Sequence, residues 1–224
     1  MNFTPKAFLF DLNGTMIDDM HFHAKAWHQI LTQDLGASLT WEEVKVQMYG
    51  KNSEVLDRIF GKSRFTAEEV LELSVEKERR YQQEYFPHLK LIDGLDNFLA
   101  QARRSGIPMA IGSAAIPFNI DFVLDNLDIR HYFKTIVSAD DVVESKPDPE
   151  TFLKAAQLLG VEPSGCVVFE DAPKGVEAAQ NAGMACVVLT TAHDPEDFSS
   201  YSNIIRFVRD YKEPALQELF QVQV

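Results

Sequence analysis

The sequence predicts a doubly wound α/β fold interrupted by one helical insertion. From about Ile92 onward, short apolar runs alternate with amphipathic stretches, which is the pattern of strands and helices in a parallel sheet. Another apolar run, Phe8 to Phe10, lies far upstream, and the segment between the two regions has helical character without strand signals. We therefore expect a parallel-sheet core formed by residues 1–17 and 92–224, and a small all-helical domain over residues 18–91.

The elements of the core follow from the positions of the apolar runs. Phe8 to Phe10 is short and continuous, as expected of a central parallel strand that is buried on both faces. Four further strands are predicted at Met109 to Gly112, Thr135 to Ser138, Val167 to Phe169 and Ala185 to Leu189. The helices predicted around them run from Gly94 to Ser105, Phe118 to Asn126, Thr151 to Leu159 and Val176 to Ala182.

The inserted segment is rich in Glu, Lys, Arg, Gln and Leu, all strong helix formers. Thr40-x-x-Glu43 and Thr66-x-x-Glu69 have the spacing of capping boxes, so a helix is predicted to begin at each. An insertion placed directly after the first strand could close over the end of that strand and exclude water. We expect this helical domain to select the substrate.

Composition excludes several classes of function. The 224 residues are 46% hydrophobic, enough for one large core and a smaller insertion. A formal charge of −13 argues against nucleic acid and anionic membranes, which bind basic surfaces. No apolar run approaches transmembrane length, the amino terminus lacks signal-peptide architecture, and Cys166 and Cys186 lie in predicted buried strands. We expect a cytoplasmic protein with reduced thiols that acts as a monomer.

The first of four polar clusters lies at the end of the first predicted strand. Asp11 follows the apolar run and is itself followed by a turn containing Asn13, Gly14 and Thr15. Open α/β sheets bind ligands at the carboxyl ends of their strands, so this is a suitable place for a nucleophilic carboxylate. The alternative is that Asp11 only ends the strand or caps a helix.

Two further clusters offer groups that bind phosphate. Ser113 ends the second predicted strand, and its hydroxyl together with the N–H groups of the turn after it, beginning with Ala114, could hold a phosphate oxygen. Lys146 lies on a loop stiffened by Pro147 and Pro149, where its ammonium could offset the charge of a carboxylate beside a phosphate dianion. Turn chemistry for Ser113 and simple solvation for Lys146 remain the alternatives.

The fourth cluster is the acid pair Glu170 and Asp171, again directly after an apolar strand. Adjacent carboxylates repel one another unless a cation lies between them, and hard oxygen ligands with open water positions suit Mg²⁺. The alternative is that both acids complement the dipole of a helix that begins here.

Taken together, these clusters resemble the four motifs of the haloacid dehalogenase-like superfamily, and their order resembles its β-phosphoglucomutase-like branch. The resemblance implies a Rossmann-like core with a small helical cap. It implies that Asp11 is the nucleophile that becomes an aspartyl phosphate, and that Ser113 and Lys146 bind the transferring phosphoryl group. It also implies a Mg²⁺ ion held by Asp11, the backbone carbonyl of Asn13, and the acids Glu170 and Asp171.

In the cap, the same resemblance matches His23 to a histidine implicated in cap closure and Lys77 to a lysine that contacts substrate. Helix packing for His23 and a solvated face for Lys77 are the alternatives. The family's cap arginine should fall near Lys51, and this chain has no arginine there. Lys51 would replace it less well, because an ammonium lacks the bidentate guanidinium fork.

Asn13 is the largest departure from the family pattern, which usually has a second aspartate here as general acid and base. An amide neither gives nor takes a proton at neutral pH, and losing a positioned acid or base costs about 10²–10⁴-fold in rate. A natural variant with altered chemistry, an engineered substitution, and a protein that binds without catalysing all fit. We expect a Mg²⁺-dependent phosphatase for a small phosphorylated metabolite, a sugar phosphate, with β-phosphoglucomutase and a catalytically silent phospho-ligand-binding protein as alternatives.

Overall fold

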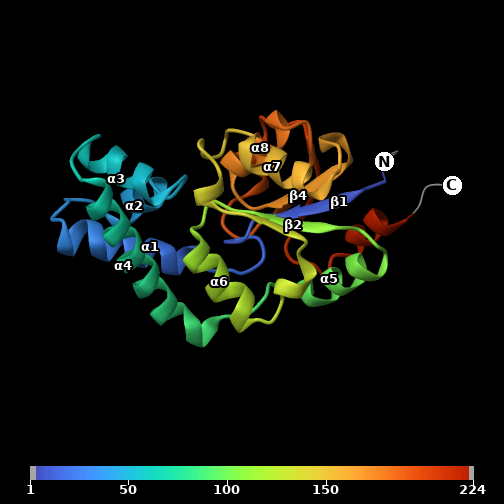
Figure 1. Ribbon diagram of the computed structural model, residues 1–224, viewed down its shortest axis with the longest axis horizontal. Coiled ribbons are helices and arrows are strands. Elements are labelled where there is room, and N and C mark those ends of the chain that lie inside the picture. The colour runs from blue at the N-terminus through green and yellow to red at the C-terminus, as the bar shows by residue number, and fades with distance from the viewer. Residues whose placement is uncertain (1–3, 222–224) are drawn as a thin grey trace. The chain divides into compact units, whose positions relative to one another are not determined.

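The computed structural model describes residues 4–221, and the chain divides into two compact units (Figure 1). One unit comprises the residues up to Asp18 and those from Lys90 onward, and the other runs from Asp19 to Leu89. The predicted core segments 1–17 and 92–224 therefore include residues 1–3 and 222–224, which lie outside the described residues.

A six-stranded parallel sheet forms the first unit, in the order β3-β2-β1-β4-β5-β6. The strands are β1 (Ala7–Phe10), β2 (Met109–Gly112), β3 (Thr135–Val137), β4 (Cys166–Glu170), β5 (Ala185–Leu189) and β6 (Ile204–Val208). Strand β1 pairs with β2 on one side and β4 on the other, so the predicted central strand is confirmed. Strand β6 was not predicted, because it is an edge strand that is only partly buried and therefore lacks a continuous apolar run.

Helices cover both faces of this sheet, which confirms the doubly wound class (Figure 1). Four α-helices flank the strands: α5 (Leu95–Arg104), α6 (Pro117–Asn126), α7 (Glu150–Leu159) and α8 (Pro173–Asn181). Phe8 and Phe10 of β1 contact Phe98 of α5 and Phe169 of β4, with the Phe10 and Phe169 rings stacked 4.7 Å apart. This aromatic packing fixes β1 and β4 against each other, and with them the residues that follow both strands.

The second unit is helical throughout its regular structure. Its elements are α1 (Met20–Gln29), a π-helical turn (Ile30–Asp34), α2 (Trp41–Val46), α3 (Asn52–Phe60), α4 (Ala67–Tyr85) and a 3₁₀ turn (Phe86–His88). Both predicted capping boxes are confirmed, because Glu43 and Glu69 accept from the backbone N–H groups of Thr40 and Thr66 at 2.7 Å each.

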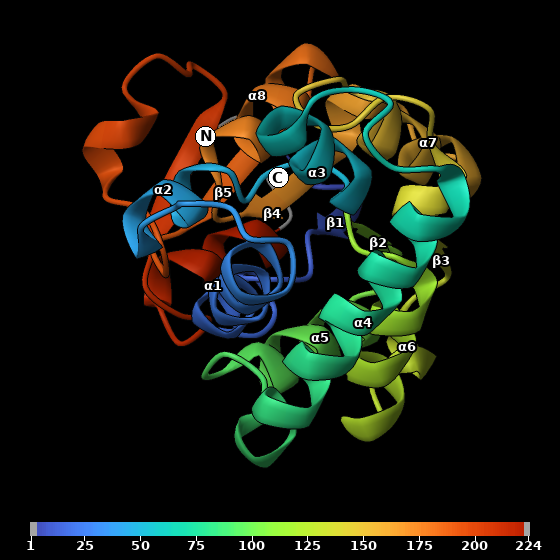
Figure 2. The same cartoon turned by 90° about the vertical axis from the view of Figure 1, so that its left-hand side faces the viewer.

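The core of the helical unit is small and apolar. Helices α1 and α4 pack against each other (Figure 2), and Trp27, Ile30, Val44 and Leu56 are among the side chains buried in this unit. Within residues 4–221, no helix combines the length and the apolar character needed to cross a lipid bilayer.

Candidate active site

Asp11 lies at the carboxyl end of the central strand and is almost fully buried. Its backbone N–H donates to the carbonyl of Phe169 in β4 at 3.0 Å, which extends the pairing of the two strands by one residue. This bond fixes the backbone at Asp11, so its carboxylate projects from a rigid position. A nucleophile requires such positioning, because the reacting atoms must approach within about 3–3.5 Å.

The buried Lys146 ammonium binds two carboxylates at this edge of the sheet. Its Nζ donates to Asp11 Oδ1 and to Glu170 Oε1, at 2.7 Å in each case. Burial lowers the pKa of Lys146, but the charges of Asp11 and Glu170 and the hydrogen bonds to them outweigh burial and hold that pKa above its ordinary value. The structure thus brings together three of the residues singled out in the sequence, with a permanent positive charge beside Asp11.

Both carboxylate oxygens of Glu170 are occupied. Oε1 accepts from Lys146, and Oε2 accepts from the backbone N–H groups of Asp171 and Ala172 at 2.8 Å each. Glu170 therefore orients Lys146 and holds the start of the loop that leads into α8. The space for this carboxylate depends on Gly175, where a Cβ atom would lie 1.7 Å from Glu170 Oε1.

Replacing Gly175 with alanine should displace the Glu170 carboxylate and destabilise the fold. Alanine is favoured over glycine in a helix by about 0.5–1 kcal/mol, whereas overpacking a filled site costs about 1–3 kcal/mol, so we expect a net loss of stability. Denaturant unfolding measures this difference. The control is Gly165→Ala, where the added Cβ would lie 3.1 Å from the flexible side chain of Lys6, and its stability should change by no more than about 1 kcal/mol. Equal stability of the two variants would contradict the close packing at Gly175.

Asp171 is a buried carboxylate that forms no ion pair with another residue between 4 and 221. Its Oδ1 accepts from the Thr15 hydroxyl at 3.1 Å. Burial, and next the negative charges of Glu170 and Asp11, raise the pKa of Asp171 well above its ordinary value. Gly14, at φ 78°, permits the close approach of the first loop, because a Cβ atom there would lie 2.1 Å from Asp171 Oδ2.

The carboxylates of this site fit a hard cation that keeps most of its water ligands. Over residues 4–221, no group of three or more His, Cys, Asp or Glu side chains is arranged to hold a metal ion. With Glu170 fully hydrogen bonded, the remaining carboxylates are Asp11 and Asp171, and Asp171 has no cationic partner among these residues. Two carboxylates, a backbone carbonyl and water are the donors that Mg²⁺ prefers.

Asn13 lies half-buried in the loop between Asp11 and Thr15, where its backbone pairs with that of Ile17 in an isolated β-bridge. Neighbouring bonds fix this loop, because Thr191 Oγ1 donates to the Gly14 carbonyl at 2.6 Å and the Tyr211 hydroxyl donates to the Thr15 carbonyl at 3.1 Å. The Asn13 amide therefore belongs to a loop that is held in place at the two residues directly after it. An amide side chain can donate and accept hydrogen bonds, but it has no transferable proton at neutral pH.

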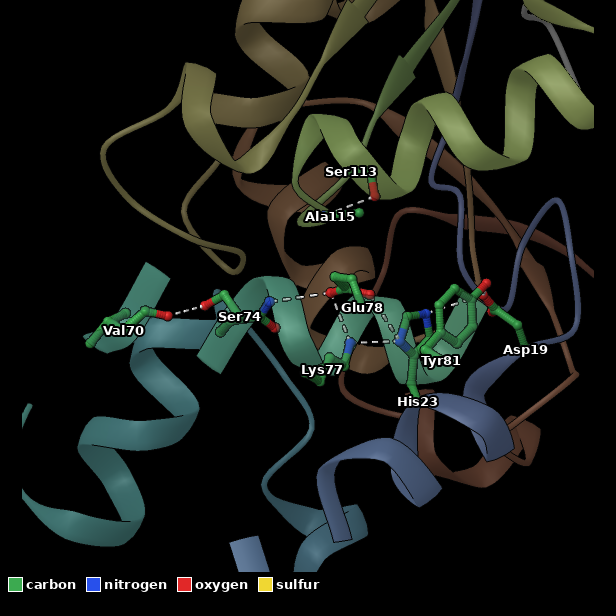
Figure 3. A network of polar contacts seen from close by, with 10 residues as sticks. Asp19, His23, Val70, Ser74, Lys77, Glu78, Tyr81, Ser113 and Ala115 are labelled. Carbon is green, nitrogen blue, oxygen red and sulfur yellow. Dashed lines mark hydrogen bonds and ion pairs between the residues drawn. The ribbon is translucent and has the colours of Figure 1, made fainter. Parts of the chain in front are cut away.

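Ser113 follows β2, the neighbour of β1, and is buried. Its N–H donates to the Val137 carbonyl at 2.9 Å, and its Oγ accepts from the N–H of Ala115 at 3.1 Å (Figure 3). Ala114 lies half-buried in the turn between them. The loop after β2 and the loop after β1 thus leave the same edge of the sheet, as the sequence predicted.

In the helical unit, His23 and Lys77 belong to a buried polar cluster (Figure 3). Lys77 Nζ lies 2.6 Å from His23 Nδ1 and donates to Glu78 Oε1 at 2.9 Å. His23 Nε2 lies 3.2 Å from Asp19 Oδ2, which also accepts from the Tyr81 hydroxyl at 2.5 Å. The half-buried Asn52 joins these residues, because its Nδ2 donates to Glu78 Oε1 at 3.2 Å. We use the name buried polar cluster for Asp19, His23, Asn52, Lys77, Glu78 and Tyr81.

Lys51, the third predicted residue of the helical unit, precedes α3 and is not a member of this cluster. Its backbone N–H donates to Glu54 Oε2 at 3.0 Å, which caps the helix. The structure therefore brings His23 and Lys77 into direct contact within the helical unit, while Lys51 lies in the turn at the start of another helix.

Sequence reasoning did not assign a role to Thr15, Asp19, Glu78 or Tyr81. The spacing in the sequence could have pointed to two of these residues. Asp19 lies four residues before His23, and Tyr81 lies four residues after Lys77, and this spacing places side chains on one helical face. The contact between Asp19 and Tyr81 joins positions 62 residues apart and could not be inferred from spacing.

The chain is similar to known proteins over most of its length. A family model described as haloacid dehalogenase-like hydrolase matches residues 5–183. The fructose-1-phosphate phosphatase of Escherichia coli is 33% identical over 191 residues, covering 80% of this chain and 93% of that protein. The β-phosphoglucomutase of Bacillus subtilis is 34% identical over 188 residues, which cover 81% of this chain and 82% of that protein. The crystal structure of β-phosphoglucomutase from Clostridium difficile superposes with a TM-score of 0.82 at 26% identity, covering 97% of both chains.

Proposed function

Because the chain belongs to the haloacid dehalogenase-like hydrolase family, a family of phosphatases and phosphomutases, we propose that it is a Mg²⁺-dependent phosphatase for a small sugar phosphate. The observation that carries this proposal is the placement of the Lys146 ammonium 2.7 Å from the carboxylate of Asp11. A carboxylate next to a fixed positive charge can attack phosphorus while the charge on the phosphoryl oxygens is neutralised.

In the proposed first step, an oxygen of Asp11 attacks phosphorus and the bond from phosphorus to the leaving oxygen breaks. Lys146 stabilises the charge on the phosphoryl oxygens, and the hydroxyl of Ser113 and the N–H of Ala114 donate to these oxygens. The product is an aspartyl phosphate, and the leaving group departs as an alkoxide that takes up a proton.

In the second step, water attacks the aspartyl phosphate, releases inorganic phosphate and regenerates Asp11. Asn13 cannot supply the proton in the first step or accept one in the second. The proton therefore exchanges with water, which slows both steps and favours substrates with good leaving groups.

Mg²⁺ would be held by Asp11, Asp171 and the backbone carbonyl of Asn13, with Glu170 contributing through a water ligand, because its own oxygens accept from Lys146 and from the N–H groups of Asp171 and Ala172. When bound, it would supply positive charge to the phosphoryl oxygens during transfer. The helical unit, through His23, Lys51 and Lys77, is proposed to contact the leaving group and thus to select the substrate.

The test is a panel of phosphorylated sugars assayed for phosphate release with added Mg²⁺, with acetyl phosphate as a minimal substrate. Acetate leaves without a proton, so formation of the aspartyl phosphate from acetyl phosphate should not need an acid at position 13. Phosphate release that depends on Asp11 supports the proposal. Binding of phosphorylated ligands without any release would instead support a silent binding protein.

A second candidate is β-phosphoglucomutase activity, favoured by the similarity to the Bacillus subtilis enzyme. The two activities differ in the fate of the phosphoryl group, which goes to water in a phosphatase and returns to the sugar in a mutase. With glucose 1-phosphate as substrate, the ratio of inorganic phosphate to glucose 6-phosphate distinguishes them.

Substituting Asp171→Asn should weaken Mg²⁺ binding by more than about 10–100-fold, because the amide keeps the size of the side chain but removes a charged ligand. Titration calorimetry with Mg²⁺ on the folded variant gives the affinity. The control is Asp96→Asn, an exposed acid in the first turn of α5, which should bind Mg²⁺ like the unmodified protein. An unchanged affinity in Asp171→Asn would place the metal elsewhere.

A further inference from the structure

Glu78 of α4 is a buried carboxylate with one satisfied and one unsatisfied oxygen. Glu78 is only 3% exposed to solvent. Oε1 accepts from Lys77 Nζ at 2.9 Å and from Asn52 Nδ2 at 3.2 Å. Oε2 is shielded from solvent and accepts no hydrogen bond from any residue between 4 and 221. A buried charged acceptor without a donor is costly, so the missing donor is expected to come from a bound molecule.

His23 does not supply that donor. Its Nδ1 lies 3.8 Å from Glu78 Oε2 but only 2.6 Å from Lys77 Nζ. An ammonium has donors only, so Nδ1 must accept from Lys77, and the ring proton lies on Nε2, directed to Asp19. The ring is also stacked on Tyr81 with centroids 3.8 Å apart, which prevents it from turning toward Glu78.

Glu78 remains ionised in this environment. Burial disfavours the charged carboxylate, but the ammonium of Lys77, which donates to Oε1 at 2.9 Å, and the hydrogen bond from Asn52 at 3.2 Å both favour it. An ionised carboxylate only accepts hydrogen bonds. Its partner must therefore be a donor such as a hydroxyl group.

With His23 neutral, the buried polar cluster carries one unit of excess negative charge, since Lys77 balances only one of the carboxylates of Asp19 and Glu78. A phosphate dianion placed beside this cluster would be repelled, whereas a hydroxyl would be attracted. The sequence has no arginine near Lys51 to bind a second phosphate, and Arg58 of α3 is engaged by the carbonyl groups of Gln47 and Tyr49.

We propose that Glu78 is a specificity-determining residue whose Oε2 accepts a hydrogen bond from a hydroxyl group of the leaving group, so that the enzyme prefers sugar monophosphates to sugar bisphosphates. This inference rests on the proposed function, in which the leaving group contacts the helical unit. It adds the chemical class of the leaving group, an uncharged polyol.

The test is the variant Glu78→Gln, assayed with fructose 1-phosphate, fructose 1,6-bisphosphate and acetyl phosphate. The amide retains an oxygen for Lys77 and Asn52 but replaces the charged acceptor at Oε2 with an NH₂ group. We expect kcat/KM for fructose 1-phosphate to fall by about tenfold relative to acetyl phosphate, because a charge-assisted hydrogen bond is lost. The bisphosphate should gain relative to the monophosphate, because the cluster loses its excess negative charge.

Two controls separate this role from a structural one. Glu72→Gln changes an exposed acid on the same helix and should leave all three ratios unchanged. Asn52→Ala removes a donor to Oε1 without altering Oε2, so it should not increase the relative use of the bisphosphate. Thermal unfolding of each variant confirms that it is folded.

The outcomes distinguish the two proposals. If the unmodified enzyme releases phosphate but Glu78→Gln leaves the substrate ratios unchanged, Glu78 Oε2 binds no hydroxyl of the substrate, as when an ordered water satisfies it, and this inference is wrong while the phosphatase stands. If Asn52→Ala produces the same shift toward the bisphosphate, the effect belongs to the cluster as a whole and the inference is also wrong. If no substrate of the panel releases phosphate, both proposals fail.

Discussion

Replacing Asn13 with aspartate is expected to raise kcat for the best sugar phosphate by about 10²–10⁴-fold, the factor that a positioned general acid or base contributes. The two side chains are nearly identical in size, and the loop is held by Thr191 and Tyr211 rather than by residue 13 alone. The substitution should therefore change the chemistry at this position more than its structure. Mg²⁺ affinity should stay nearly constant, because the proposed ligand is the backbone carbonyl of residue 13.

Steady-state turnover of both forms, with Mg²⁺ affinity measured alongside, tests this expectation. The unmodified enzyme should form the aspartyl phosphate from acetyl phosphate and then hydrolyse it slowly, which predicts a burst in rapid-quench experiments. The burst should disappear in Asn13→Asp if hydrolysis is no longer limiting. Equal or lower turnover by the variant would contradict the assigned mechanism and indicate that the Asn13 amide has a different task, in which case Asn13→Ala should lose activity as well.

The edge of the sheet that carries the candidate site was predictable because each polar residue follows a short apolar run. In a parallel sheet the carboxyl ends of all strands lie at one edge, so Asp11, Ser113 and Glu170 had to lie on it once β1, β2 and β4 were recognised. The salt bridge from Lys146 to Asp11 joins residues 135 positions apart, so spacing could not predict it, and only the resemblance to a family assigned both residues to one site.

The parts that could not be predicted depend on packing. Nothing in the sequence shows that Glu170 turns one oxygen back to the N–H groups of Asp171 and Ala172, or that Gly175 makes room for it. The unsatisfied oxygen of Glu78 is likewise visible only when every neighbour has been placed. Apolar periodicity identifies elements, but hydrogen-bond satisfaction is a property of the folded chain.

Substituting Lys146→Met should have the largest combined effect on activity and stability. Removing the ammonium leaves the carboxylates of Asp11 and Glu170 buried without their shared cation, which costs about 3–5 kcal/mol of unfolding free energy. It also removes the fixed positive charge proposed to stabilise the phosphoryl oxygens, so kcat should fall by at least about 10²–10³-fold. Denaturant unfolding without Mg²⁺ and phosphate release with Mg²⁺ measure the two effects separately.

The double variant Lys146→Met with Glu170→Gln separates charge from packing. A glutamine at position 170 has a carbonyl oxygen that can still accept from the N–H groups of Asp171 and Ala172, but it removes one of the two uncompensated charges. We therefore expect the double variant to be more stable than Lys146→Met while remaining equally inactive, because the lost ammonium is needed for transfer and not only for folding. If the double variant is no more stable, the cost of Lys146→Met arises from packing against Phe152, whose ring lies 4.6 Å from Nζ. If Lys146→Met retains its turnover, the ammonium serves only to neutralise buried carboxylates, and the charge that assists phosphoryl transfer must come from the metal alone.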